Sequence, residues 1–285
     1  MTSGSGLLTF ADIQPGIQEG RLDLDLIFSD KSNRRRFERK WSEFYASDSR
    51  HSDIFLREGN DILVFLTESL IPLKSDGRPS VLMLLGNPAT HSVFSGMCFS
   101  FEGANREHRF WVALRESGFL EFYSDSSHPW LTRDEQNRIR KKELFSLEYH
   151  SPFRIGIAVY FSIPSAASSS PWSGVGGLQR LFGRKALCAI AAEEQRRIES
   201  IIRVFIRSGG GVVAFQRDAY EGIRAPDAPS YQLDLAKRGE LHGKYKFNSR
   251  IHLLGSPPTR ILHTREARDV LVQFKTRIIE GLDQE

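Results

Sequence analysis

The segment Ser80–Trp111 decides the fold of this chain, and it reads SVLMLLGNPATHSVFSGMCFSFEGANREHRFW. Its first six residues are apolar almost throughout, which is typical of a β-strand covered on both faces. The triplet at positions 86–88, Gly-Asn-Pro, then breaks the strand, and a loop of small residues follows. An apolar strand that ends in such a loop is typical of α/β proteins, which bind their ligands beyond the carboxyl ends of the strands.

Three more strands and the helices that separate them extend this pattern toward the C-terminus. The predicted strands are 154–161, 212–215 and 250–254, and the predicted helices follow Asn105 and cover 185–208, 216–223 and the segment after Thr264. Strands that alternate with helices imply a mainly parallel sheet with helices on both faces. We therefore expect an α/β fold with a central, mostly parallel four-stranded sheet in a domain that spans residues 79–285.

The region before this domain is predicted to be a helical extension that covers residues 1–78 and packs on the core. Phe37, Trp41 and Tyr45 recur at four-residue spacing within the expected helix 32–47. A second helix is expected over 60–71, followed by a loop rich in Pro, Gly and Ser.

Composition indicates a globular protein that stays in solution. The chain has 285 residues, of which 40% are hydrophobic and 26% charged. It has two cysteines, Cys98 and Cys188, so no disulfide framework is implied. The N-terminus lacks the basic start and apolar core of a secretion signal, and the longest apolar run is far below the roughly 20 residues that span a bilayer. We expect a cytoplasmic monomer without membrane contact.

Basic residues occur in several clusters, and the net charge is +4 with a pI near 9.1. The clusters are Arg34–Arg36 with Arg39 and Lys40; Arg138, Arg140, Lys141 and Lys142; Arg180, Arg184 and Lys185; and Arg260, Arg265, Arg268, Lys275 and Arg277. Each cluster alone fits the solvated face of a helix. Gathered on one surface they would attract a polyanion, and the phosphate backbone of DNA is the commonest one.

Several well-known catalytic signatures are absent from the sequence. It contains no phosphate-binding loop of the Gly-x-x-x-x-Gly-Lys-Ser/Thr type and no Gly-x-Gly-x-x-Gly after the first strand. It also lacks the histidine and cysteine spacings of zinc sites and the Gly-x-Ser-x-Gly elbow of ester hydrolases. We therefore expect no metal and no cofactor.

The opening segment resembles the mismatch-specific uracil/thymine-DNA glycosylases, a family of the uracil-DNA glycosylase superfamily. The matching residues are Asn87-Pro88, Gly96, Phe99-Ser100-Phe101, Ala104-Asn105-Arg106, Phe110-Trp111 and Gly118-Phe119. The stretches VVAFQRDAYEGI and IHLLGSPPTRILHTREA resemble later parts of the family pattern. The resemblance runs from about Ser80 to the C-terminus and implies a three-layer α/β fold that removes a base from DNA.

The resemblance also implies roles for individual residues. Such enzymes flip the nucleotide out of the duplex, and we expect the aromatic ring of Phe99 to stack on the base. The amide of Asn87 would position a water at the sugar C1′ rather than take its proton. His263 is the expected aid to the departing base, with His91 as the alternative. The other substrate-binding residues are Gly86, Pro88, Ala89, His91 and Ser256. No lysine lies in this motif, so a monofunctional glycosylase without a Schiff base is expected.

Two further features bear on the substrate. Thr259, Arg260 and Arg265 fall where the family enters the duplex or contacts phosphate, so they are the predicted DNA-binding residues. Ala89 is small where strict uracil enzymes carry a bulky residue, which suggests a roomy pocket. A bulky modified pyrimidine of bacteriophage DNA is one hypothesis, and removing it would make the protein an antiviral defence factor.

Two other functions remain open on the sequence alone. Gly255 stands where the family commonly has His or Asn, and it has no side chain with which to polarise a base. This departure favours a non-catalytic DNA-binding or lesion-sensing protein on the same scaffold. A nucleosidase that acts on small substrates is the third hypothesis, and the basic clusters argue against it.

Overall fold

The computed structural model describes residues 6–100, 106–127, 131–166, 169–206, 210–262 and 264–283. Over these ranges the chain has an α/β fold whose strands form a mixed nine-stranded sheet and a separate two-stranded one. The chain divides into two compact units, each made from segments that are distant in sequence. Unit 1 comprises Met1–Ser69, Gly86–Cys98 and Val159–Arg197; unit 2 comprises Leu70–Leu85, Phe99–Ala158 and Ile198–Glu285.

Four antiparallel strands dominate the N-terminal region, which corrects the predicted helical extension over 1–78. They are β1 (Leu8–Gln14), β2 (Gly16–Asp23), β3 (Phe55–Glu58) and β4 (Ile62–Leu70), with β2 and β3 both paired to β4. The predicted helix over 60–71 is therefore wrong. Glu58 pairs with Ile62 across a hairpin turn in which Gly59 has φ of +59°, a conformation that side chains disfavour. The Glu-Gly-Asn-Asp turn was the missed signal.

The first predicted helix is confirmed as α2 (Lys31–Ala46). Asp30 caps it by accepting a hydrogen bond from Ser32 N at 2.8 Å. Phe37, Trp41 and Phe44 line its buried face. They lie against aromatic rings from later in the chain: Phe37 meets Phe182 at 5.3 Å between centroids, and Phe44 meets Trp172 at 6.2 Å. Phe182 is the last residue of α8 (Gly174–Phe182). Aromatic packing therefore joins two of the three segments of unit 1, Met1–Ser69 and Val159–Arg197.

The shorter elements of unit 1 are α1 (Leu24–Ile27), α3 (His51–Ile54) and α4 (Thr90–Ser95). The long helix α9 (Arg184–Phe205) begins in unit 1 and ends in unit 2.

The parallel core of the fold lies in unit 2, and all four predicted strands are confirmed there. They are β5 (Ser80–Leu85), β8 (Arg154–Val159), β9 (Gly210–Ala214) and β11 (Asn248–Gly255). The order is β8-β5-β9-β11-β10, where the unpredicted β10 (His242–Tyr245) is antiparallel to β11. Leu84 pairs with Ala214, and Ala214 pairs with Gly255. The carboxyl ends of β5, β9 and β11 therefore share one edge of the sheet.

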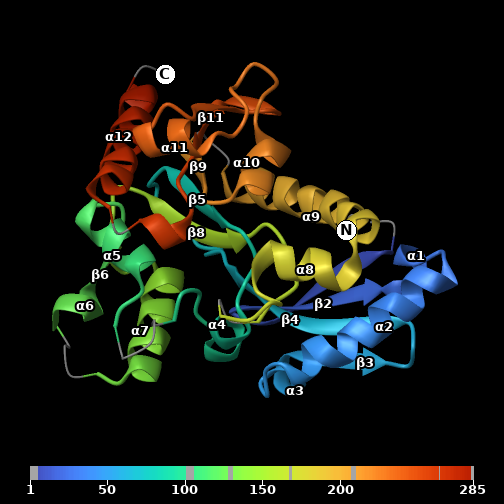
Figure 1. The fold of residues 1–285 in the computed structure, drawn as a ribbon. Helices are drawn as coiled ribbons and strands as arrows, with labels where there is room; N and C mark the ends of the chain where they lie inside the picture. The colour runs from blue at the N-terminus through green and yellow to red at the C-terminus, as the bar shows by residue number, and fades with distance from the viewer. Residues whose placement is uncertain are drawn as a thin grey trace. The chain divides into compact units, whose positions relative to one another are not determined.

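The helices of unit 2 confirm part of the prediction. The predicted ones are α5 (Arg109–Glu116), α10 (Arg217–Ile223) and α12 (Arg265–Asp283), whereas α6 (Tyr123–Ser127), α7 (Arg133–Ser146) and α11 (Leu233–Arg238) were not predicted. The helix α12 packs beside α11 and α5 (Figure 1). Its apolar face is buried, and Thr264 Oγ1 caps it by accepting from Ala267 N at 3.3 Å. The predicted cap of α5, Asn105, lies outside the described residues, and His108 occupies the N-cap.

The two-stranded sheet also belongs to unit 2. It pairs β6 (Glu121–Phe122) with β7 (Tyr149–His150) in antiparallel register, and neither of these short strands was predicted.

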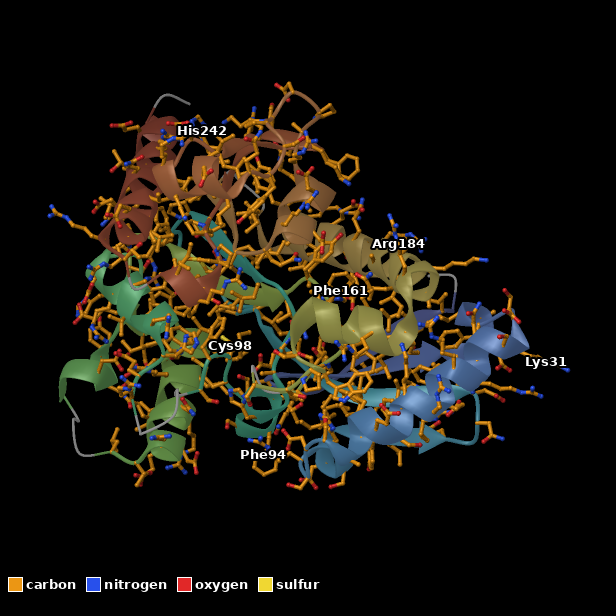
Figure 2. The ribbon with its side chains drawn as sticks, in the orientation of Figure 1. Lys31, Phe94, Cys98, Phe161, Arg184 and His242 are labelled. Carbon is orange, nitrogen blue, oxygen red and sulfur yellow. The ribbon has the colours of Figure 1, made fainter. Side chains whose placement is uncertain are left out.

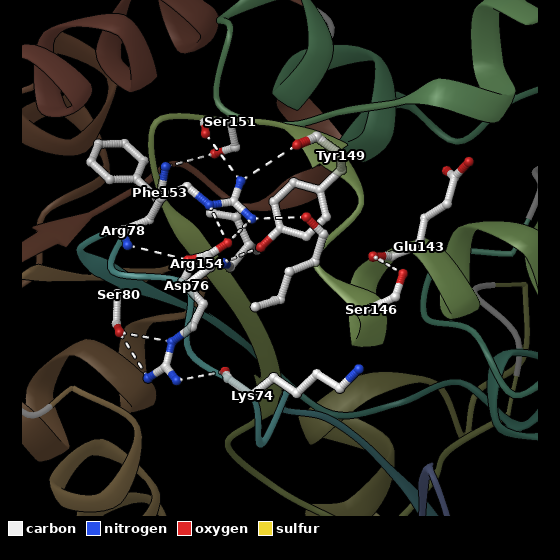
Figure 3. A network of polar contacts seen from close by, with 12 residues as sticks. Lys74, Asp76, Arg78, Ser80, Glu143, Ser146, Tyr149, Ser151, Phe153 and Arg154 are labelled. Carbon is white, nitrogen blue, oxygen red and sulfur yellow. Dashed lines mark hydrogen bonds and ion pairs between the residues drawn. The ribbon is translucent and has the colours of Figure 1, made fainter.

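A buried arginine ties the starts of two core strands together (Figure 3). Arg154, at the beginning of β8, is 7% exposed and donates to Ser80 Oγ at 2.9 Å and to Lys74 O at 2.8 Å. Nearby, Arg78 lies over the ring of Tyr149 at 4.5 Å and donates to Ser151 O at 3.1 Å. These contacts fix the amino ends of β5 and β8. The candidate residues come after the carboxyl ends of the strands.

Candidate functional site

Asn87 follows β5 by two residues, in backbone that is hydrogen-bonded on both sides of it. Gly86 O accepts from Phe161 N at 2.9 Å, and Pro88 O accepts from Ser165 N at 3.0 Å. The Asn87 side chain is half-buried, and its Nδ2 donates to Pro88 O at 3.3 Å. Its Oδ1 has no hydrogen-bond donor among the residues that the structure describes. The amide oxygen is therefore oriented by its own nitrogen and available to accept a hydrogen bond from water.

The residues just after Asn87 begin a short helix. Ala89 is half-buried and forms an isolated β-bridge with Ser165. His91 lies in the first turn of α4 and is also half-buried. Burial lowers the pKa of His91 from 6.5, the positive charge of Arg50 lowers it further, and Asp48 opposes both effects. His91 is therefore neutral at pH 7, where it can form hydrogen bonds with a base but brings no positive charge.

A histidine that sequence reasoning missed supports this segment from α3. His51 is fully buried, with Nε2 3.0 Å from Thr90 Oγ1 and Nδ1 3.0 Å from Phe44 O. Thr90 Oγ1 is also 3.0 Å from Ser165 O. A lone histidine in a polar stretch gives no sequence signal, because its partner is thirty-nine positions away.

Two side chains further along this segment differ sharply in exposure. Phe94, on α4, is 60% exposed (Figure 2). An exposed phenylalanine seven positions after Asn87 is another residue that the sequence reasoning did not select. Cys98 is 3% exposed, and burial raises the pKa of its thiol well above 9.0, so it stays protonated and unreactive.

Phe99 belongs to unit 2 and lies in an aromatic cluster. Its φ is +48°, a left-handed conformation that is rare outside glycine, and its carbonyl accepts from Trp111 Nε1 at 3.0 Å. The half-buried ring stacks on His108 at 4.3 Å and meets Phe110 at 4.7 Å. Phe110 and Trp111 are buried. The ring of Phe99 is thus held in a fixed position, and a base stacked on it would extend a stack that His108 begins.

Close packing at the end of β11 leaves no room for a side chain at Gly255. A Cβ on Gly255 would lie 2.3 Å from Leu241 Cδ2 and 3.0 Å from Tyr220 Cδ2. Ser256 is fully buried; its N donates to Ala214 O at 2.9 Å and its carbonyl accepts from Tyr231 Oη at 3.1 Å. The hydroxyl of Ser256 donates to Pro257 O at 3.2 Å, so its substrate-binding role stays a prediction.

The predicted DNA-binding residues follow in the loop after β11. Thr259 is half-buried and Arg260 exposed, both in a single 3₁₀ turn (Thr259–Ile261). Arg109, at the start of α5, donates to Arg260 O at 2.6 Å. Within unit 2, this contact joins the beginning of α5 to the loop that follows β11. Arg265 is 86% exposed, with Asp269 at 3.9 Å. His263, the predicted aid to the departing base, lies outside the described residues.

Basic residues of two predicted clusters come together in unit 1. Lys40 on α2 donates its ammonium group to Arg180 O on α8. Burial lowers the pKa of Lys40, and the charges of Arg36, Arg180 and Arg39 lower it further, while Glu43 opposes them. Arg36, Arg39 and Arg180 are exposed. These four residues, the α2–α8 basic cluster, therefore concentrate positive charge that faces solvent.

Neither a metal-binding group nor a membrane-spanning helix occurs in the part of the chain that the structure describes. Within those ranges, no group of three or more His, Cys, Asp or Glu side chains is placed to hold a metal ion. Over the same residues, no helix has the length and apolar character needed to cross a membrane.

Comparisons with protein-family models and with curated proteins give no match for this chain.

Proposed function

We propose that this protein is a monofunctional DNA glycosylase, with Asn87 as the residue that positions the attacking water. The observation that carries the proposal is the state of the Asn87 amide. It follows a strand of the parallel core, its backbone is hydrogen-bonded at Gly86 and Pro88, and its oxygen is without a donor among the described residues. Because the amide oxygen has no other donor among those residues, it can accept a hydrogen bond from a water and hold that water in the orientation needed for attack.

The proposed reaction is hydrolysis of the bond between the base and the deoxyribose. Water adds its oxygen to C1′, the C1′–N bond breaks, and its electron pair leaves with the base. The proton that the water loses goes to solvent or to the departing base. The transition state has the character of an oxocarbenium ion, by analogy with O-glycoside hydrolysis. Asn87 Oδ1 would accept a hydrogen bond from the water, while the pKa shift of His91 makes it a neutral partner for the base.

Two further observations support DNA as the substrate. The α2–α8 basic cluster gives unit 1 a surface that attracts phosphate, and Arg260 and Arg265 add exposed positive charge to unit 2. Phe99 offers an aromatic ring held in place by Trp111 and His108. Ala89 adds little bulk beside Asn87, so a pyrimidine with a large substituent remains the favoured base, and removal of such a base from phage DNA would protect a host.

A release assay on purified protein tests the proposal. The DNA duplexes would carry uracil, a thymine mismatch, hypoxanthine, 5-hydroxymethylcytosine or glucosylated 5-hydroxymethylcytosine, and alkali would cleave the abasic product. Wild type is expected to act on at least one duplex, and Asn87→Ala is expected to lose at least about a hundredfold in rate. Asn33→Ala, an exposed asparagine on α2, is the matched control and should retain full activity. Equal rates for Asn87→Ala and wild type would refute the assigned role.

One observation favours the second candidate, a non-catalytic DNA-binding or lesion-sensing protein. Gly255 has no room for a side chain, so the residue that could polarise the base carbonyl cannot stand there without a shift of Leu241. Salt-sensitive duplex binding by wild type, with no abasic product from any duplex, would support this candidate and end the glycosylase proposal.

A further inference from the structure

Unit 2 contains a cavity of about 550 Å³ that the proposed function does not use. One wall comes from the last turns of α9, with Glu199, Arg203 and Ile206 at helical spacing. The other wall is the β10–β11 hairpin, which supplies Tyr245, Phe247 and Asn248. The volume falls within the range of sites for small molecules.

This cavity lies at the opposite edge of the sheet from the loop after β11. Asn248 begins β11, and Ile206 precedes β9 by four residues. The two strands are parallel, since Ile251 pairs with Gly210 and Gly255 with Ala214. Residues at their amino ends are therefore separated from Ser256 and Arg260 by the length of the strands. A ligand here would be bound independently of the proposed glycosylase chemistry.

The charges that line the cavity leave a cation in excess among the described residues. Lys246 Nζ lies 2.7 Å from Glu199 Oε1 and donates to Gly222 O at 2.8 Å, so the carboxylate of Glu199 is already neutralised. Arg203 is exposed, and within the described ranges no carboxylate pairs with it. An arginine in this state is suited to bind an anionic group, above all a phosphate.

The hairpin contributes an aromatic surface and polar groups. Phe247 is 68% exposed at the turn. The ring of Tyr245 meets it edge-on at 5.7 Å between centroids, and Lys246 Nζ lies 4.8 Å from the centroid of the Phe247 ring. Asn248 lines the cavity; its Oδ1 accepts from Arg250 N at 3.0 Å, which leaves its amide nitrogen as the group that can donate to a ligand. Burial raises the pKa of Tyr245 to about 12, so the phenol is neutral and can both donate and accept.

We propose that this cavity binds a nucleoside phosphate, with the base on Phe247, its polar edge at Asn248 and Tyr245, and the phosphate at Arg203. Phe247 is the natural stacking surface because a flat ring covers its exposed face, and Ile206 and Ile251 close the cavity as apolar floor. The same chemistry is present in a free nucleotide and in an unpaired nucleotide at the end of a DNA strand.

Titration calorimetry with two probes distinguishes these sources. The probes are deoxythymidine or deoxyadenosine monophosphate, and a short single-stranded oligonucleotide with a 5′-phosphate. Phe247→Ala and Arg203→Gln are each expected to weaken binding by about fivefold or more, because stacking and phosphate contacts are worth at least that much. Arg250→Gln is the control: this arginine is exposed on the same hairpin but does not line the cavity, and its loss should have little effect.

The outcomes separate clearly. Binding of the mononucleotide that depends on Phe247 and Arg203 supports a site for free nucleotides, and binding of the oligonucleotide alone, with the same dependence on Phe247 and Arg203, supports a strand-end site. No binding of either probe, or equal losses in Arg203→Gln and Arg250→Gln, would overturn the proposal. Mononucleotide binding is measured without any cleavage of a glycosidic bond, so failure of the glycosylase proposal would leave this result unchanged.

Discussion

His51 Nε2 lies 3.0 Å from Thr90 Oγ1, and this contact joins α3 to the helix that begins three residues after Asn87. The other ring nitrogen, Nδ1, faces Phe44 O at 3.0 Å, a group that can only accept. In the neutral ring the proton therefore resides on Nδ1, and Nε2 accepts from the Thr90 hydroxyl. Thr90 Oγ1 also donates to Ser165 O at 3.0 Å, so its single proton is shared between the two acceptors. In a protonated ring Nε2 would instead donate to Thr90 Oγ1.

The first prediction concerns the pH dependence of stability. Burial is the main cause that lowers the pKa of His51 below 6.5, so the unfolded chain binds its proton first as the pH falls. The stability contributed by neutral His51 is fully present above about pH 6.5 and is lost as the pH falls toward the folded-state pKa. The free energy of unfolding, from urea titrations at pH 7.5 and 5.5, should drop less in His51→Gln than in wild type, by on the order of 1 kcal/mol.

His150→Gln serves as the control for that experiment, because His150 is exposed. Its pH dependence should follow that of wild type. Parallel pH profiles for wild type and His51→Gln would contradict the prediction.

The second prediction concerns the close packing at Gly255. A Cβ added there meets Leu241 Cδ2 at 2.3 Å, so Gly255→Ala should destabilise the fold by about 1–3 kcal/mol. Combining Gly255→Ala with Leu241→Ala removes the closest contacts and leaves Tyr220 Cδ2 at 3.0 Å, so the two losses should be less than additive. Thermal or urea unfolding of the three variants measures the coupling.

Gly176 provides the comparison for glycine removal. It lies within α8, and a Cβ there has nothing within 4 Å. Gly176→Ala should be neutral or stabilising by up to about 1 kcal/mol. Strictly additive losses at Gly255 and Leu241 would show that the packing is not what excludes a side chain.

The third prediction tests the α2–α8 basic cluster. Replacing Arg36, Arg39 and Arg180 together with glutamine should weaken duplex binding and lower the slope of log K against log salt by about three, if each contacts one phosphate. Fluorescence anisotropy at several salt concentrations measures the slope. Arg238→Gln, which removes an exposed arginine paired with Glu240 at 2.8 Å, is the control. An unchanged slope in the triple variant would place the DNA elsewhere.

The fourth prediction concerns a buried ion-pair network in unit 2. Arg140 is 1% exposed, lies 2.6 Å from Asp125, and also pairs with Glu107. Arg140→Met should lower the free energy of unfolding by about 3–5 kcal/mol, because it removes the buried cation between two carboxylates. Arg115 is the cation that remains beside them in the described part of the chain, at 2.9 Å from Glu107 and 3.6 Å from Asp125. Arg138→Met, on the exposed face of the same helix, should change it by less than about 0.5 kcal/mol. Similar losses in the two variants would rule out the network as the cause.

Sequence patterns predicted best the elements whose signals, the spacing of apolar residues and the residues that begin or end the element, lie within the element itself. The buried strand Ser80–Leu85 and the helix Lys31–Ala46 carry their own signals, and both are confirmed. The strand Ile62–Leu70 does not, because an apolar run of this length fits helix or strand alike, and its antiparallel partners decide the outcome.

The candidate residues show the same division. Asn87 was accessible to sequence reasoning because it follows a recognisable strand. His51 and His108 were not, because the contacts to Thr90 and to the ring of Phe99 that give them a role arise only in the folded chain. Likewise, the reason for Gly255 lies in Leu241 and Tyr220, which no local pattern connects with it.

The segmented make-up of unit 1 has a consequence for synthesis on the ribosome. The aromatic face of α2 leaves the exit tunnel long before Trp172 and Phe182, the rings it packs against. At ordinary elongation rates this gap lasts on the order of ten seconds, far longer than a helix or hairpin needs to form. Phe28, His51 and Phe55 emerge early and can cover part of this aromatic face. The part that Trp172 and Phe182 cover stays exposed on the nascent chain through that interval. Slower translation between positions 46 and 172 should lower the yield of native protein.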